Sequence, residues 1–168
     1  MRARPLLAFD DDAALAAFTP VNDVVMGGVS EGAVVRAAPG LASFTGRVSL
    51  EHGGGFASVR AALAPRALVG AVGLLLRVRG DGKRYRVQCR TGLTSGATAY
   101  GAAFTPSADL ADVPLHFDDF VLRRFGRAVD GPPFRGADVV SIGLLIGEGQ
   151  EGAFRLDLAR IDALEPGP

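Results

Sequence analysis

The fold is decided by the stretch Lys83-Arg84-Tyr85-Arg86-Val87-Gln88-Cys89-Arg90. Apolar side chains occupy every second position, at Tyr85, Val87 and Cys89, and polar side chains occupy the positions between them. Successive side chains of a strand point to opposite faces, so this period of two predicts a strand with one buried face. The exposed face of that strand then carries Arg84, Arg86, Gln88 and Arg90.

The same alternation recurs in other short segments. Residues 41–50 place Phe44, Val48 and Leu50 on one face, and residues 154–158 repeat the pattern. Clusters of Gly and Pro separate about ten such segments, without helices long enough for crossovers, which favours an antiparallel sandwich or barrel. The sequence therefore predicts an all-β fold, in a single domain that spans residues 1–168.

One short helix is expected near the N-terminus, over residues 13–18. Asp11 or Asp12 can cap its first amides, and Pro20 prevents its continuation. The cluster Asp10-Asp11-Asp12 is then a cap and a solvated turn. Its alternative reading is a structural calcium site, since hard cations bind clustered carboxylates.

The composition excludes several classes of function. Lys and Arg together number 18, as do Asp and Glu, so no global positive field favours nucleic acid. Cys89 is the single cysteine, which rules out an internal disulfide framework. Asp10 ends the first apolar run too early for a signal peptide, and no apolar run reaches the length of a membrane span. We expect a cytoplasmic protein that does not span the membrane.

Catalytic machinery is sparse. His52 and His116 are the only histidines, they are far apart in the chain, and they form no zinc-binding spacing. The sequence contains no phosphate-binding loop, nucleophile elbow or dinucleotide fingerprint in a strand-helix context. We therefore expect no enzyme activity, no metal and no cofactor.

The segment Val21-Asn22-Asp23-Val24-Val25-Met26-Gly27-Gly28-Val29-Ser30 reads as a loop between two strands. Its paired glycines can supply the positive φ angles of a tight bend, which is a purely structural role. A loop on a rigid scaffold is equally a common place for ligand or partner contact. Both interpretations stay open.

Arginines gather on the polar faces of several expected strands. Residues 71–79 and 83–91 predict a hairpin over Gly80-Asp81-Gly82. If these strands and 55–60 are neighbours, one sheet carries guanidinium groups beside Phe56, a surface suited to carboxylate, phosphate or acidic protein groups. The alternative is a solvent face whose arginines pair with acidic neighbours. Residues 120–127 add a second Phe and Arg cluster, read either as an interface or as core with arginines at its rim.

An ordered series of short motifs resembles one family. The series comprises Asn22-Asp23, Met26-Gly27-Gly28-Val29-Ser30, Phe44-Thr45-Gly46, Gly54-Gly55-Phe56-Ala57-Ser58-Val59-Arg60, Arg79-Gly80-Asp81-Gly82-Lys83 with Tyr85, Phe120 to Arg127, Ser141 to Ile146 and Gly152 to Leu156. It is similar to the complex I intermediate-associated protein family (NADH:ubiquinone oxidoreductase intermediate-associated). The resemblance implies a jelly-roll β-sandwich like galactose-binding domains, and mitochondrial members are assembly chaperones for respiratory complex I without chemistry of their own. Without a transit-like N-terminus or a tryptophan, the chain looks like a compact bacterial member.

The expected function is therefore a binding module that assists assembly of respiratory complex I at the cytoplasmic periphery of the inner membrane. Its partners would be complex I subunits or assembly intermediates. The alternative is a module for a small polar ligand or a glycan, although few exposed aromatic platforms are available for sugars. The candidate binding residues are Asn22, Asp23, Met26, Gly27, Gly28, Ser30, Phe56, Ser58, Arg60, Arg79, Asp81, Arg86, Arg123 and Arg127.

Overall fold

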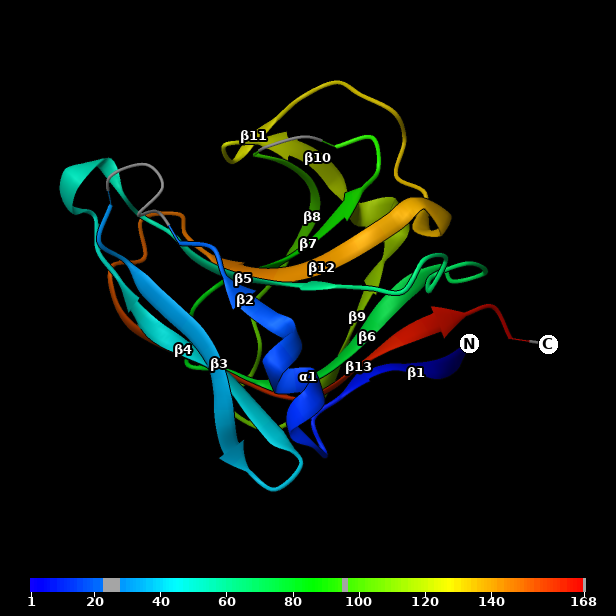
Figure 1. Cartoon of the computed structure of the whole chain (residues 1–168), viewed down its shortest axis with the longest axis horizontal. Coiled ribbons are helices and arrows are strands. Elements are labelled where there is room, and N and C mark those ends of the chain that lie inside the picture. Colours follow the sequence, from blue (N-terminus) through cyan, green and yellow to red (C-terminus); the bar gives the residue numbers. More distant parts are fainter. Residues whose placement is uncertain (23–27, 95–96, 168) are drawn as a thin grey trace.

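The computed structural model describes residues 1–22, 28–94 and 97–167, and strands dominate it (Figure 1). The strands are β1 (Arg2–Ala8), β2 (Phe18–Pro20), β3 (Glu31–Ala38), β4 (Leu41–Val48), β5 (Ala57–Ala62), β6 (Gly73–Arg79), β7 (Tyr85–Thr91), β8 (Thr98–Phe104), β9 (Ala111–His116), β10 (Val121–Arg124), β11 (Arg127–Ala128), β12 (Val139–Ile146) and β13 (Gly152–Glu165). The helices are α1 (Asp12–Ala17) and the one-turn 3-10 helices η2 (Glu51–Gly53), η3 (Phe117–Asp119) and η4 (Gly136–Asp138).

The strands form two sheets that lie face to face (Figure 1). A six-stranded sheet has the order β3-β4-β13-β6-β9, and β1 joins it by pairing with β13. A seven-stranded sheet has the order β11-β10-β8-β7-β12-β5-β2. Every strand pairing in the described part of the chain is antiparallel. The prediction of an all-β, jelly-roll antiparallel β-sandwich is confirmed.

The core lies between the sheets and follows the alternation of the sequence. Tyr85, Val87 and Cys89 of β7 are all buried. The Tyr85 ring meets Phe44 of the facing sheet edge-on, at 6.3 Å between centroids. Strand β7 thus packs its apolar face inward and turns its arginines outward. Leu50 was expected to point inward as well, but it is 45% exposed because β4 ends at Val48.

The N-terminal helix forms where the sequence predicts it. Asp11 is the N-cap, and its carboxylate accepts the Ala13 amide at 3.0 Å. The Asp12 carboxylate pairs with the Arg36 guanidinium of β3 at 3.0 Å. No group of three or more His, Cys, Asp or Glu side chains within residues 1–22, 28–94 and 97–167 is arranged to hold a metal ion. None of the helices described there is long and apolar enough to cross a membrane.

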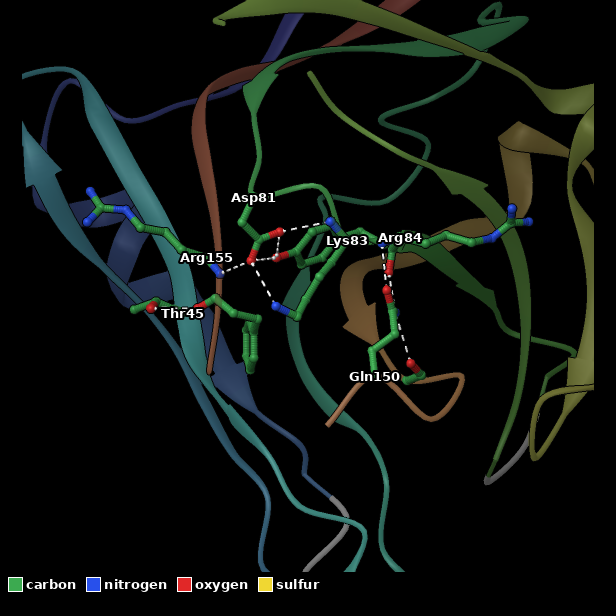
Figure 2. Close-up of polar contacts among 9 residues, drawn as sticks. Thr45, Asp81, Lys83, Arg84, Gln150 and Arg155 are labelled. Atoms are coloured by element: carbon green, nitrogen blue, oxygen red, sulfur yellow. Dashed lines mark hydrogen bonds and ion pairs between the residues drawn. The ribbon is translucent and has the colours of Figure 1, made fainter. Parts of the chain in front are cut away.

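The predicted hairpin between β6 and β7 is wrong. Strand β6 pairs with β13 and β9, whereas β7 pairs with β12 and β8, so the chain changes sheets between residues 79 and 85. Figure 2 shows that Asp81 holds this crossing: its carboxylate accepts the Tyr85 hydroxyl at 3.0 Å and the Arg155 amide at 2.8 Å. Contacts to other strands therefore replace the local pairing that the turn residues indicated.

Candidate functional site

A groove of about 680 Å³ runs over the outer face of the seven-stranded sheet. Strands β5, β7, β10 and β11 contribute side chains to it, and the turn after β12 contributes Glu148. Figure 1 shows β10 and β11 rising away from β12 and β5, so this sheet is strongly curved. Side chains that characterise the groove are Phe56, Arg60, Arg86, Arg90, Arg123 and Phe125.

Two glycines of the seven-stranded sheet pair with residues that line this groove. Gly143 of β12 lies opposite Arg60 of β5 on one side and Gln88 of β7 on the other. Gln88 lies in turn opposite Gly101 of β8. A Cβ at Gly101 would stand 2.7 Å from Cδ of Arg86, so the Arg86 stem fills the space that this glycine leaves. The absence of a side chain at Gly101 thus lets the long Arg86 side chain lie across the sheet.

Arg86 is held at one end of the groove by an acidic residue. Its side chain is only 11% exposed, and Nη2 lies 3.4 Å from Glu148 Oε1. Arg84 Nε approaches Glu148 Oε2 at 3.3 Å. Burial and the nearby charge of Arg123 lower the pKa of Arg86, and Glu148 opposes that effect.

Gln150 fixes the turn that carries Glu148 (Figure 2). Oε1 of Gln150 accepts a hydrogen bond from the backbone N–H of Arg84 at 2.8 Å, and Nε2 of Gln150 donates one to the Arg84 carbonyl at 2.8 Å. It also donates to the Gly147 carbonyl at 2.9 Å. These bonds tie residues 147–150 to the start of β7, which explains why Glu148 lies beside the guanidinium groups of Arg84 and Arg86.

Arginines toward the centre of the groove lack such a partner. The Nε atoms of Arg60, Arg90 and Arg123 are buried and have no hydrogen-bond acceptor among the described residues. Burial, and then the like charge of Arg60, lowers the pKa of Arg90 to about 10. Buried polar groups in native proteins are nearly always hydrogen-bonded, so three orphaned donors in one groove need an explanation.

The six-stranded sheet provides the contrast within the same molecule. Most of its outward arginines meet a carboxylate, as the solvent-face alternative expected, although exposed Arg47 of β4 meets none among the described residues. The ion pairs there are Arg77–Asp112, Arg79–Asp157, Arg155–Asp157 and Arg160–Asp162, with distances between 2.7 and 3.1 Å. Burial alone would raise the pKa of Asp157, but hydrogen bonds from Arg79 and Arg155 hold it below its usual value. Arginines of the six-stranded sheet are thus mostly paired with carboxylates, whereas several arginines of the groove have no such partner in the part of the chain that the structure describes.

The structure brings together some of the candidate residues and separates others. Those that line the groove are Phe56, Ser58, Arg60, Arg86, Arg123 and Arg127. Arg79 and Asp81 do not line it, because β6 belongs to the other sheet. The hypothesis that residues 71–79 continue the same arginine face is therefore wrong.

The described ends of the loop at residues 22–30 make structural contacts. The Asn22 side-chain oxygen accepts the Ser58 amide at 3.1 Å, and the Ser58 hydroxyl donates to the Val21 carbonyl. The Ser30 hydroxyl accepts the Ser49 amide at 2.9 Å, and Gly28 is buried. Asp23, Met26 and Gly27 lie outside the described residues. A binding role for this loop stays a prediction.

The Phe and Arg cluster at residues 120–127 divides into core and surface. Phe120 is buried, with its ring centroid 4.9 Å from that of Phe134. Phe125 is 64% exposed and belongs to the groove wall. Arg123 Nη1 donates to the Gly126 carbonyl at 3.1 Å, which braces the turn between β10 and β11. The core interpretation holds for Phe120 and fails for Phe125.

The candidate binding residues did not include three arginine-face residues of the groove, Arg84, Gln88 and Arg90, or its acid Glu148. Gln88 and Arg90 share the outward positions of β7 with Arg86, so the period of two was already the signal for them. Glu148 carried no such signal, because Gly147-Glu148-Gly149 reads only as a turn. Neither His52 nor His116 belongs to the groove lining.

The comparisons with known proteins agree with this architecture. A family 11 carbohydrate-binding module from Clostridium thermocellum, in complex with a β-1,3-1,4-mixed-linked tetrasaccharide, has a TM-score of 0.67 at 13% identity and covers 98% of each chain. The family 11 module of a cellulosomal cellulase from that organism has a TM-score of 0.68 at 13% identity, with 98% of this chain and 97% of that chain covered. A family 30 carbohydrate-binding module has a TM-score of 0.53 at 12% identity, with 88% of this chain and 95% of that chain covered. At these identities the likeness shows the fold alone.

No curated protein matches this sequence significantly. The family described as complex I intermediate-associated protein 30 matches residues 7–158, which is most of the chain. That match covers every strand of the groove, and it agrees with the ordered motifs of the sequence. The chain belongs to the complex I intermediate-associated protein 30 family.

Proposed function

We propose that this protein is a non-catalytic binding domain that assists the assembly of respiratory complex I. It would work on the cytoplasmic side, at the periphery of the inner membrane, and hold a complex I subunit or assembly intermediate in the groove. Membership of a family described as complex I intermediate-associated supports the partner. The single observation that carries the site is that the buried Nε donors of Arg60, Arg90 and Arg123 have no acceptor within residues 1–22, 28–94 and 97–167.

The chemistry of the groove supports binding rather than catalysis. Its polar lining consists mainly of guanidinium groups, which donate hydrogen bonds and keep their proton at neutral pH. Ser58 is the one hydroxyl among the described residues of the lining, and it already donates to the Val21 carbonyl. A set of fixed donors on a rigid sheet recognises an anion; it does not move a proton.

An affinity experiment tests this function. The tagged protein is incubated with detergent-solubilised native membranes, and complex I subunits are identified among the retained proteins. Arg60→Glu places a negative charge in the groove and should abolish their recovery. The matched control is Arg66→Glu, because Arg66 is exposed in the turn after β5 and lies outside the groove. Both variants should melt at the wild-type temperature.

Two results would refute the proposal. One is that the wild-type protein retains no complex I subunit. The other is that Arg60→Glu and Arg66→Glu retain the subunits equally, since the groove would then play no part in the interaction. Asp23→Ala, tested in the same way, extends the experiment to the loop at residues 22–30.

Carbohydrate binding is the second candidate, and one observation favours it. The exposed Phe125 ring and the half-buried Phe56 ring border the groove, and aromatic faces are common platforms for ligands with apolar surfaces. Two of the structural relatives are carbohydrate-binding modules in name. Calorimetric titration with neutral β-glucan oligosaccharides tests this candidate: saturable binding that Phe125→Ala removes would support it, and no heat of binding would dismiss it.

A further inference from the structure

We propose that the ligand of the groove is an acidic segment of polypeptide, whose carboxylates bind the guanidinium groups of Arg60 and Arg90. We further infer that Glu148 acts as an intramolecular counterion that occupies Arg86. The choice of polypeptide over another polyanion rests on the proposed function. The charge of the ligand rests on the groove itself.

Arg60 and Arg90 form a pair across strand β12. Arg60 lies opposite Gly143, and Arg90 lies opposite Ser141, two residues along the same face. Each has a buried Nε that finds no acceptor in the described part of the chain, and the two charges lie close enough to lower the pKa of Arg90. Like charges held together in a partly buried site repel, and a carboxylate between them removes both the repulsion and the missing hydrogen bonds.

A carboxylate shared by two arginines is already present in the groove, because Glu148 lies between Arg84 and Arg86. Its two carboxylate oxygens lie 3.3 Å from Arg84 Nε and 3.4 Å from Arg86 Nη2. Within the described residues, the groove therefore offers an internal carboxylate to Arg84 and Arg86, whereas the Nε atoms of Arg60 and Arg90 have no acceptor. The Arg84–Glu148–Arg86 arrangement shows how this surface binds a carboxylate, and the Arg60 and Arg90 pair offers the same donors to a ligand.

The groove lining is also positively charged, although the chain as a whole is neutral. The whole sequence has no net charge, yet among the residues that the structure describes the groove brings together six arginines and one glutamate. Arg123 and Arg127 extend the positive region toward β11. Complementary potentials of this kind select oppositely charged partners and speed their association. A neutral sugar chain would leave these guanidinium groups unpaired.

The test uses a fluorescein-labelled hexaglutamate peptide and the full-length protein, with binding followed by fluorescence anisotropy. We expect saturable binding that weakens strongly between about 0.05 M and about 0.5 M salt, because exposed charges are screened over that range. Hexaglutamine, which has the same length and no charge, should not bind. Unlabelled oligogalacturonate should compete poorly, since its carboxylates are spaced by sugar rings.

Single substitutions locate the binding. Arg60→Gln and Arg90→Gln should each weaken hexaglutamate binding by about tenfold, the effect of one charge-assisted hydrogen bond. Arg66→Gln is the matched control and should leave it unchanged. Glu148→Gln frees Arg86 and should strengthen binding by about threefold, as expected for a half-exposed ion pair.

Four results would overturn the inference: equal binding of hexaglutamine, no binding of hexaglutamate, equal losses in Arg66→Gln and Arg90→Gln, or displacement of the peptide by oligogalacturonate at lower concentration than by hexaglutamate. The membrane experiment keeps the two proposals apart. If complex I subunits are recovered regardless of Arg60 and Arg90, the inference fails and the groove is not the binding site, while the association with complex I stands. If hexaglutamate binds through these arginines and no subunit is recovered, the anion site stands and the assembly function fails.

Discussion

Replacement of Arg90 by Met should make the protein more stable. Arg90 is the last residue but one of β7, with its Nε buried and without an acceptor among the described residues. The fold holds this charge near Arg60 at a cost, which appears as a pKa lowered to about 10 by burial and by that neighbour. Methionine keeps most of the apolar stem and removes the charge.

The size of the effect follows from that pKa. A pKa of the Arg90 guanidinium lowered to about 10 corresponds to an unfavourable contribution of about 3 kcal/mol at most to the free energy of unfolding. Solvent still reaches part of the guanidinium, so we discount this to a gain of about 1–2 kcal/mol in the free energy of unfolding. For a chain of this length, that gain corresponds to a rise of about 2–8 °C in the melting temperature.

Urea denaturation at neutral pH, followed by circular dichroism, measures the difference. The control is Arg160→Met on the other sheet, where the guanidinium pairs with Asp162 at 3.0 Å and its loss leaves a buried carboxylate unpaired. That control should lose stability. If Arg90→Met also unfolds at a lower urea concentration than the wild-type protein, the reasoning is refuted, because Arg90 would then contribute to the fold and not to a ligand site.

Three other substitutions test the scaffold of the groove. Gly101→Ala puts a methyl group 2.7 Å from Cδ of Arg86, so we expect weaker hexaglutamate binding in the anisotropy assay and a loss of about 1 kcal/mol in urea; unchanged values in both would contradict the packing. Asp81→Asn removes the carboxylate that accepts the Tyr85 hydroxyl, and the urea midpoint should fall by the equivalent of about 1–3 kcal/mol at an unchanged slope. The pKa of Asp157 is lower in the folded than in the unfolded protein. Its contribution to the free energy of unfolding is therefore present above about pH 4 and disappears as the pH falls through the folded-state pKa. Thermal unfolding should therefore show a larger deficit for Asp157→Asn at pH 7 than near about pH 2, and an equal deficit at both would argue against the ion pairs with Asp157.

Local patterns predicted much of the fold. The alternation at residues 83–90 identified Tyr85, Val87 and Cys89 as core, and the structure buries all three. The Asp11 cap and the short helix after it were also readable, because capping depends on residues within one turn. The same alternation placed the groove arginines of β7 on an outward face. Each of these features depends on neighbours in the chain, which is why the sequence alone was enough.

The sheet assignment of β6 was not readable in this way. Gly80-Asp81-Gly82 has the composition of a hairpin turn, and a crossing between sheets uses the same residues. The outcome depends on Asp81 reaching Tyr85 and the backbone of Arg155, which is distant in sequence. The hypothesis of one arginine face that included Arg79 failed for that reason.

By itself, then, the sequence determined which side chains of each strand are apolar and face the core, and hence the all-β class. Only the tertiary structure decided which arginines share a groove and which have acidic partners. Arg60 and Arg90 meet because β12, a strand that follows both in the chain, lies between β5 and β7. Strand order depends on contacts between distant segments, and the period of a single strand carries no record of its neighbours.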